Sequence, residues 1–237
     1  IAGIKKLSLE LGSNAPMIVM RDADLDQVAK ATAVGGFVNA GQVCISTQRV
    51  LVDRDVYSDF LDATKAEVEG IVSGDPLDEN TGLGPLVEEA EAMRVDEWVH
   101  EAVTGGARLV TGGERDGARY APTILADVDP GMRVSCEELF GPAIAVTPVD
   151  DIDTAISLAN DSRFGLGTGI FTRDINDAMR YAREAECGNV MINWTPLWRA
   201  DFQPYGGFKQ SGIGKEGPRY AIDEMTEIKT VVVHGLD

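Results

Sequence analysis

Histidine and cysteine, which many hydrolytic and metal-dependent sites use, are scarce in this sequence. Its 237 residues include two histidines, His100 and His234, which stand far apart. The three cysteines, Cys44, Cys136 and Cys187, show no CxxC spacing and are odd in number, which argues against a disulfide framework and against a zinc site. A Ser-His-Asp or Cys-His mechanism therefore has little material. We expect no bound metal, and we expect any catalytic base to be a carboxylate.

Positive charge and long apolar runs are also scarce. Lys and Arg number 21 against 39 Asp and Glu, and the resulting net charge of −18 repels phosphate backbones and anionic membranes. No apolar run reaches the roughly 18 residues of a membrane span, and no basic-then-apolar leader is present. We expect a cytoplasmic protein that binds neither nucleic acid nor membrane. The 22 Asp against 7 Lys fit a salt-loving source as well as ordinary bacterial acidity.

What the sequence does contain is an alternation of strand and helix patterns. Short apolar or alternating runs predict strands at 7–11, 17–20, 49–52, 108–111, 143–149, 167–172 and 190–192. Apolar spacings of three and four predict helices over 25–36, 56–68, 87–104, 152–160 and 175–184. Asp22 and either Asp150 or Asp151 are expected as helix caps, and Gly41 as a helix end. This order predicts an α/β fold, a three-layer α/β/α domain with a mostly parallel sheet.

Two residues in this pattern are candidates for chemistry. Cys44 follows a turn of small residues, where N–H groups at a helix terminus would favour a thiolate; a lone Cys between Val43 and Ile45 is also typical of a small buried hydrophobe. Glu10 lies in the strand pattern of 7–11, on the face opposite to its leucines. A Glu that lines a cleft would have the raised pKa of a base near neutral pH, but the pattern alone favours a solvated outer face.

Four motifs carry a resemblance to a known family. Leu9–Pro16 is LELGSNAP, Gly41–Cys44 is GQVC, Glu137–Pro142 is EELFGP and Pro204–Gly212 is PYGGFKQSG. In this order, and with the Glu and Cys 34 positions apart, they resemble the glutamate, cysteine, cofactor-side and glycine-rich motifs of the aldehyde dehydrogenase superfamily. The resemblance spans nearly the whole chain and implies NAD(P)-dependent oxidation of an aldehyde.

The resemblance assigns a role to each candidate. Cys44 would add to the aldehyde carbonyl, the thiohemiacetal would release hydride to the nicotinamide, and Glu10 would deprotonate the water that hydrolyses the thioester. The backbone N–H of Cys44 would be one donor to the oxyanion. The family's second donor, an Asn side chain, would lie upstream of Ile1.

Cofactor contacts follow from the same resemblance. Glu138 would accept hydrogen bonds from the nicotinamide-side ribose of NAD or NADP, and Phe140 would position the nicotinamide ring. Leu11 and Gly12 of the glutamate motif would lie on the cofactor side as well. The alternative interpretation of Glu137 and Glu138 is a charge pair at a helix start.

The segment before the glycine-rich motif lines the aldehyde tunnel in the family. There Arg199 would favour a substrate with a carboxylate or phosphate, with pairing to Asp201 as the alternative, and Tyr205 would contact the substrate. Cys136 and Cys187 match no catalytic position and are expected to be packing residues. The motif wording is similar to that of relatives acting on small polar aldehydes such as lactaldehyde, succinate semialdehyde or glyceraldehyde 3-phosphate.

The resemblance also divides the chain. Residues 1–11 would be the last strand of a dinucleotide-binding domain, 12–224 the catalytic domain, and 225–237 a C-terminal oligomerisation strand that adds to a neighbouring subunit. We expect a homo-oligomer, dimer or tetramer, for the full-length protein. Since the family's dinucleotide-binding domain lies mostly before the glutamate motif, we expect this chain to be a truncated catalytic portion that is inactive alone.

Three other functions compete. A CoA-acylating semialdehyde dehydrogenase shares the fold and cysteine but generally lacks the base that Glu10 supplies. A thiol hydrolase of another class, or an inactive interaction scaffold, would need no nicotinamide. The GxGxxG at 212–217 follows no apolar strand and precedes Pro218, so we interpret it as a loop and not as a dinucleotide-binding fingerprint.

Overall fold

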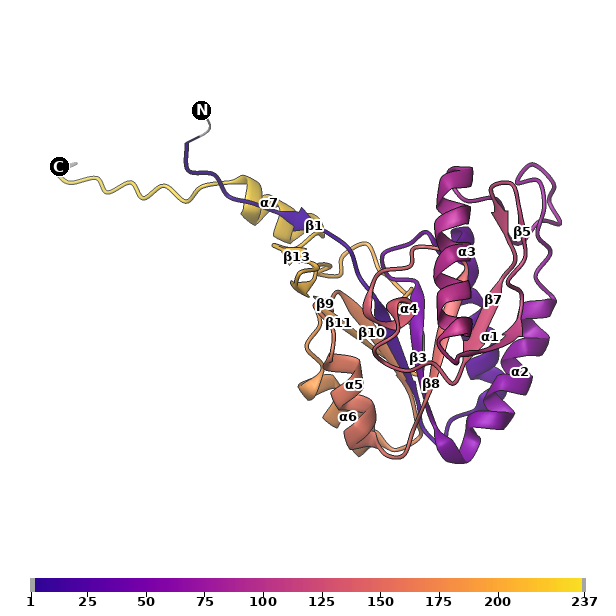
Figure 1. The fold of residues 1–237 in the computed structure, drawn as a ribbon. Helices are drawn as coiled ribbons and strands as arrows, with labels where there is room; N and C mark the ends of the chain where they lie inside the picture. The colour runs from indigo at the N-terminus through magenta and orange to yellow at the C-terminus, as the bar shows by residue number, and fades with distance from the viewer. Residues whose placement is uncertain (1–2, 236–237) are drawn as a thin grey trace.

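A seven-stranded sheet forms the centre of the computed structural model, which describes residues 3–235 (Figure 1). The strand order is β11-β10-β2-β3-β8-β7-β4. Every neighbouring pair is parallel except β4 and β7 at one edge. The strands are β2 (Ala15–Val19), β3 (Thr47–Asp53), β4 (Arg108–Thr111), β7 (Thr123–Ala126), β8 (Ala143–Val149), β10 (Gly167–Phe171) and β11 (Asn189–Ile192). The predicted mostly parallel sheet is confirmed.

Helices cover both faces of this sheet. One face carries α1 (Leu25–Phe37), α2 (Tyr57–Glu69), α3 (Glu89–Thr104) and the short α4 (Arg133–Cys136), and the other carries α5 (Ile152–Asn160) and α6 (Ile175–Glu184). Because β2 and β3 are covered on both sides, every residue in them is buried. The three-layer α/β/α prediction is therefore confirmed. No helix among residues 3–235 is both long and apolar enough to cross a membrane.

Aspartate side chains cap the starts of α1, α5 and α6. Asp24, and not the predicted Asp22, caps α1 by accepting a hydrogen bond from the backbone N–H of Gln27. Asp22 instead accepts hydrogen bonds from the loop 172–174, which ties the end of β10 to the start of α1. Asp151 caps α5, as one of the two predicted alternatives.

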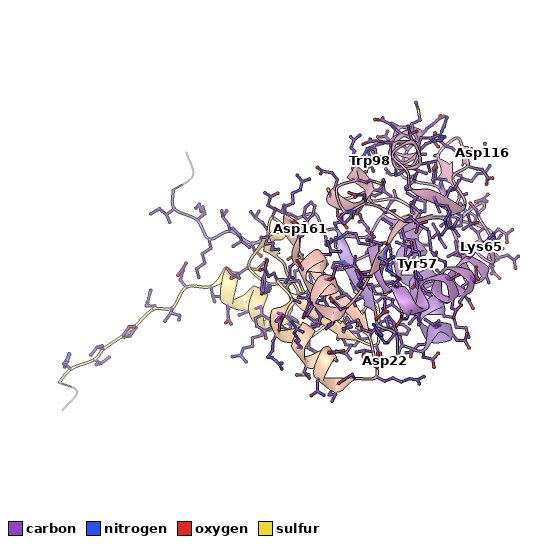
Figure 2. All side chains as sticks on the ribbon, turned by 60° about the horizontal axis from the view of Figure 1, so that its bottom comes forward. Asp22, Tyr57, Lys65, Trp98, Asp116 and Asp161 are labelled. Atoms are coloured by element: carbon purple, nitrogen blue, oxygen red, sulfur yellow. The ribbon has the colours of Figure 1, made fainter. Side chains whose placement is uncertain are left out.

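The two ends of the chain meet outside the central sheet. Figure 1 shows β1 (Leu9–Glu10) beside β13 (Gly212–Ile213) and α7 (Pro218–Met225), and Figure 2 shows both terminal segments projecting from the body. β1 pairs antiparallel with β13. A second small ladder joins β12 (Phe208–Lys209) to β9 (Phe164–Gly165), and β5 (Arg115–Asp116) pairs with β6 (Arg119–Tyr120). We call residues 3–12 and 206–225 the arm, and the sheet with its helices α1–α6 the body.

The predicted strand at 7–11 is wrong in length and in orientation. Only two of its residues form β1, and Leu7, Leu9 and Leu11 are 58%, 37% and 49% exposed, so they do not face a core. Glu10 is the partly buried residue of this segment. The physical reason is the partner: β1 pairs with a two-residue strand and not with the central sheet, which leaves the leucines without a covering layer.

The C-terminal tail forms no strand in the described part of the chain. Residues 226–235 lie beyond α7 without a ladder, and Val231, Val232 and Val233 are exposed. Among the described residues, the part of the predicted oligomerisation strand that the structure covers, 225–235, pairs with no other strand. Residues 1–2 and 236–237, at the ends of the predicted terminal segments, lie outside the described residues. The GxGxxG segment at 212–217, predicted to be a loop, is a loop only in part: Gly212 and Ile213 form β13, and Glu216 makes an isolated β-bridge with Tyr205.

Candidate active site

The loop that carries Cys44 connects α1 to β3. After Phe37 the backbone turns through three successive residues with positive φ, Asn39 (52°), Ala40 (55°) and Gly41 (69°). A Cβ on Gly41 would lie 2.1 Å from the carbonyl oxygen of Gly141, so only glycine lets these two loops touch. The cysteine motif is thereby placed against the cofactor-side motif.

Hydrogen bonds to the body fix the rest of this loop. The Ser46 hydroxyl donates to the carbonyl of Gly35 at 3.1 Å, and the Gln42 side chain accepts from the backbone N–H of Val87 at 2.9 Å. Ile45 is buried and begins the path into β3. The position of this loop therefore follows from the packing of the core.

The Cys44 sulfur is half-buried and has one close polar neighbour. It lies 2.9 Å from the hydroxyl oxygen of Tyr205, in a small apolar cluster that includes Ile45 and Leu166. The predicted contact with N–H groups at a helix terminus is wrong. The preceding α1 ends at Phe37, the end of a helix that presents carbonyl groups, and a strand follows the loop.

Glu10 lies on the arm, opposite Gly212 in the β1–β13 ladder. Its carboxylate faces Gly206: a Cβ built there would lie 2.8 Å from Glu10 Oε1. Burial, followed by the nearby Glu216 carboxylate, raises the pKa of Glu10, while Lys215 and Arg199 act in the opposite direction. The net direction agrees with the raised pKa predicted for a cleft-lining base.

The structure brings the two predicted catalytic residues to one turn. The Tyr205 hydroxyl lies 2.9 Å from the Cys44 sulfur, and a Cβ on the next residue, Gly206, would lie 2.8 Å from Glu10 Oε1. The turn is fixed by a pair of backbone hydrogen bonds between Tyr205 and Glu216. Cys44 and Glu10, far apart in the sequence, therefore both lie near the start of the glycine-rich motif.

Arg199 lies at the same turn but does not pair with Asp201. Its guanidinium forms an ion pair with Glu216 and stacks over the Tyr205 ring, 4.2 Å from the centroid. The Lys215 ammonium donates to the carbonyl of Gly206, and burial lowers the pKa of Lys215. Lys215 and Glu216 were not among the predicted site residues; their signal in the sequence is a Lys-Glu pair that begins three positions after the glycine-rich motif.

Of the residues predicted on the cofactor side, Glu138 and Gly12 lie close together. The Glu138 carboxylate accepts a hydrogen bond from the backbone N–H of Ser13 at 2.8 Å, and burial raises the pKa of Glu138. A Cβ on Gly12 would lie 2.5 Å from Glu138 Oε2, so the absent side chain makes room for this carboxylate. Phe140 has a positive φ of 49° and a ring that is 39% exposed, and Leu11 is exposed beside Gly12.

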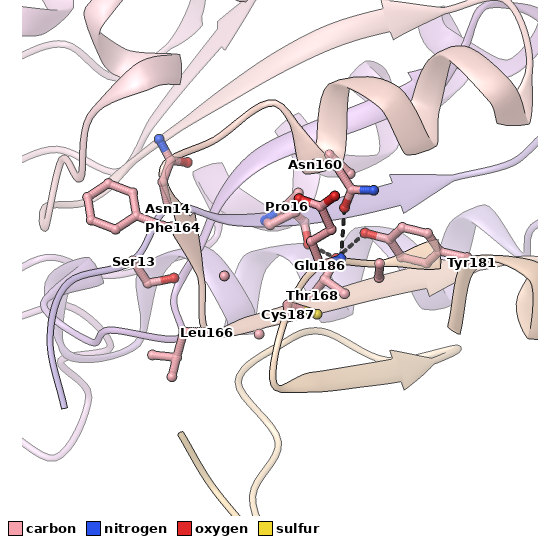
Figure 3. Close-up of a pocket in the computed structure, with 14 residues that line it drawn as sticks. Ser13, Asn14, Pro16, Asn160, Phe164, Leu166, Thr168, Tyr181, Glu186 and Cys187 are labelled. Carbon is pink, nitrogen blue, oxygen red and sulfur yellow. Dashed lines mark hydrogen bonds between the residues drawn. The ribbon is translucent and has the colours of Figure 1, made fainter. Parts of the chain in front are cut away.

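Neither of the other cysteines belongs to this site. Cys136 is exposed and donates to the carbonyl of Pro130, so its prediction as a packing residue is wrong because α4 leaves it at the surface. Burial raises the pKa of Cys187 to about 11. Cys187 lines a cavity of about 10 Å³, close to the volume one water needs (Figure 3). Residues 3–235 contain no cluster of three or more His, Cys, Asp or Glu able to hold a metal.

Residues 1–231 match the model of the aldehyde dehydrogenase family. This chain belongs to the aldehyde dehydrogenase family. It is 50% identical over 233 residues to a 3-sulfolactaldehyde dehydrogenase from Priestia aryabhattai, a match that covers 98% of this chain and 49% of the relative. The chain thus spans about half the length of the relatives it matches.

Solved aldehyde dehydrogenases share the fold. A glyceraldehyde-3-phosphate dehydrogenase from Methanocaldococcus jannaschii, complexed with NADP, aligns with a TM-score of 0.95 and 41% identity over 98% of this chain and 50% of that one. Aldehyde dehydrogenase 21 from Physcomitrella patens, in complex with the product succinate, aligns with a TM-score of 0.93 and 40% identity over 97% and 48%. Other matching structures contain NAD or NADP.

Proposed function

We propose that this chain is the catalytic portion of an NAD(P)-dependent aldehyde dehydrogenase in which Cys44 is the nucleophile and Glu10 the base. The observation that carries the proposal is the shared turn: the Tyr205 hydroxyl lies 2.9 Å from the sulfur, and a Cβ on the next residue, Gly206, would lie 2.8 Å from the Glu10 carboxylate. A nucleophile and a base must reach the same acyl carbon in succession, and a turn that adjoins both groups supports this pairing.

The reaction follows from these two groups. The Cys44 thiolate adds to the carbonyl carbon, and the resulting oxyanion accepts a hydrogen bond from the Cys44 backbone N–H. A bound nicotinamide cofactor supplies the hydride acceptor. Loss of hydride restores the carbonyl and leaves a thioester on Cys44. Glu10 then takes a proton from a water molecule as the oxygen of that water attacks the thioester carbon. The C–S bond breaks, the carboxylic acid is released, and Cys44 returns to the thiolate form.

The cofactor side fits a nicotinamide nucleotide. Glu138 offers a half-buried carboxylate whose Oε2 lies over the space that Gly12 leaves free, suitable for accepting from ribose hydroxyls. The exposed ring of Phe140 offers a flat apolar contact for the nicotinamide. The matching structures that contain NAD or NADP support this assignment.

For the substrate we propose a small aldehyde with an anionic group, bound by Arg199. This guanidinium is 42% exposed and pairs with Glu216, a partner that a substrate carboxylate, phosphate or sulfonate can replace. The names of relatives acting on 3-sulfolactaldehyde or bound to succinate support an acidic substrate. Arg199→Ala should lower kcat/KM for an anionic aldehyde about 10- to 100-fold, without a comparable loss on a neutral one. Arg219→Ala, an exposed arginine on α7, is the matched control.

Active-site variants of the full-length protein test the reaction. Cys44→Ala should form no NAD(P)H. Glu10→Gln should retain a burst of one NAD(P)H per site and lose about 10²- to 10⁴-fold in the steady state, because acylation needs the thiolate and only deacylation needs the base. A Cys44→Ala enzyme that still oxidises aldehydes would overturn the proposal. A rate that depends on CoA, and not on Glu10, would favour the CoA-acylating alternative.

Two further parts of the proposal concern the whole protein. The relatives are about twice as long as this chain, so we propose that the 237 residues alone do not form NAD(P)H; turnover by the isolated chain would refute this.

We also propose that the tail 226–235 pairs with the open edge strand β11 of a second copy. At the end of this strand and in the segment after it, Ile192, Trp194 and Trp198 are exposed. Deleting residues 226–237 should then reduce the oligomer to a smaller species in sedimentation experiments.

A further inference from the structure

The Tyr205 side chain is the group that approaches the Cys44 sulfur most directly. Its ring is buried at 3% exposure, and its hydroxyl oxygen lies 2.9 Å from Cys44 Sγ. Its backbone N–H donates to the carbonyl of Glu216 at 3.2 Å, and the Glu216 N–H donates back at 2.6 Å. The hydroxyl is therefore held at the sulfur by the backbone and by burial of the ring.

The chemistry of the phenol decides which atom donates. Burial raises the pKa of Tyr205 above its ordinary value, and the hydrogen bond with Cys44 acts in the same direction. The Arg199 guanidinium stacked over the ring opposes this shift without reversing it. Tyr205 thus keeps its proton over the working pH range. When Cys44 is a thiolate, the phenol O–H donates and the sulfur accepts.

We propose that Tyr205 is a positioning residue that acts through Cys44: its hydroxyl donates to the thiolate and holds the sulfur at the turn shared with Glu10. The inference rests on the proposed function of Cys44 but concerns a different step, the preparation of the thiolate before the aldehyde arrives. A donated hydrogen bond stabilises the negative charge on the sulfur.

This stabilisation has a signature that a packing role would not produce. Hydrogen bonding to an anion enlarges the thiolate fraction at low pH but makes each thiolate less nucleophilic. Loss of the hydroxyl should therefore slow the reaction of Cys44 at low pH and accelerate it at high pH. A merely loosened fold would change the rate in one direction at all pH values.

Alkylation of the protein with iodoacetamide measures this directly. The rate at Cys44 is followed by mass spectrometry of the tryptic peptide 31–49, from about pH 5 to about pH 10, in the wild type and in Tyr205→Phe. We expect the midpoint of the rate profile to rise by about one pH unit, with a rate about threefold lower below the midpoint and about threefold higher on the plateau. Tyr220→Phe removes the same hydroxyl from α7 and should leave the profile unchanged.

A midpoint that does not move in Tyr205→Phe overturns the proposal, whatever happens to the plateau. Should that variant fail to fold, Arg199→Gln tests the same hydrogen bond, because removing the guanidinium over the Tyr205 ring weakens the phenol as a donor. The midpoint of the rate profile in Arg199→Gln should rise by a few tenths of a pH unit. An unmoved midpoint in this variant overturns the proposal. The thiol measurement needs no aldehyde, so it stays separate from a failure of Cys44→Ala to abolish oxidation.

Discussion

The nucleophile and the base are held by two very different parts of the molecule. Cys44 belongs to the body, on a loop between a packed helix and the fully buried strand β3. Glu10 belongs to the arm, on the two-residue strand β1. The other residue of that strand, Leu9, and its partner in β13, Ile213, are 37% and 59% exposed. The arm is linked to the body by the β12–β9 ladder and by Ser211, whose hydroxyl donates to the carbonyl of Gly12 and accepts from the N–H of Gly165.

This difference teaches which forces fix each group. The sulfur is positioned by the same apolar burial that stabilises the fold, where each buried Leu, Val or Phe contributes about 1.5–3 kcal/mol. The carboxylate is positioned by a few hydrogen bonds, each worth only about 0.5–1.5 kcal/mol net. We therefore expect damage near Cys44 to appear as lost stability, and damage near Glu10 as lost deacylation with the fold retained.

The largest effect is expected in the body, from Gly41→Ala. The new Cβ would meet the Gly141 carbonyl oxygen at 2.1 Å on a backbone with φ +69°, so both a clash and left-handed strain must be relieved. We expect a loss of about 3–5 kcal/mol, or roughly 10 °C in Tm. Gly117→Ala is the matched control, because it carries the strain of φ +59° with nothing within 4 Å. Equal Tm losses in the two variants would show that the loop contact contributes nothing.

A smaller effect, of another kind, is expected in the arm from Gly212→Ala. Its Cβ would meet the Leu9 carbonyl oxygen at 2.0 Å and push β1 away from β13. In the full-length enzyme, deacylation should slow about 10- to 100-fold as Glu10 leaves its place, while the acylation burst stays intact and Tm changes by less than about 2 °C. Gly106→Ala, at φ +111° with open space around it, is the control. A large fall in Tm would place the arm within the cooperative core.

The body was predictable from the sequence to a degree that the arm was not. The patterns at 143–149 and 152–160 predicted the bounds of β8 and α5. The apolar residues of each element pack against the neighbouring layer, and their spacing is visible within that element's own sequence. β7, Thr123–Ala126, was not predicted, although β4, which is equally four residues long, was. Its place beside β8 depends on tertiary pairing.

In the arm, the decisive partners lie far apart in the sequence. The alternation at 7–11 predicted that the leucine face would be covered, and this is wrong because the covering depends on the pairing with β13 about 200 residues later. Arg199 was expected to have Asp201, two positions away, as its alternative partner, and it pairs with Glu216. The motif resemblance identified Cys44 and Glu10, whereas the contact between Tyr205 and the sulfur required the fold.

The smallest expected effect concerns the charge on Glu10 itself and its dependence on pH. Burial raises the pKa of Glu10 in the folded protein above its unfolded value, so the folded state holds the proton more tightly. The stability that this provides is present at pH values below the unfolded pKa and is lost as pH rises through the folded pKa. The glutamine in Glu10→Gln cannot ionise. The Tm of this variant minus the Tm of the wild type should therefore be about 1–2 °C larger near pH 8 than near pH 4. Glu67→Gln, an exposed glutamate on α2, removes the same charge in the body, and an equal pH trend in both variants would mean that the arm does not bury Glu10.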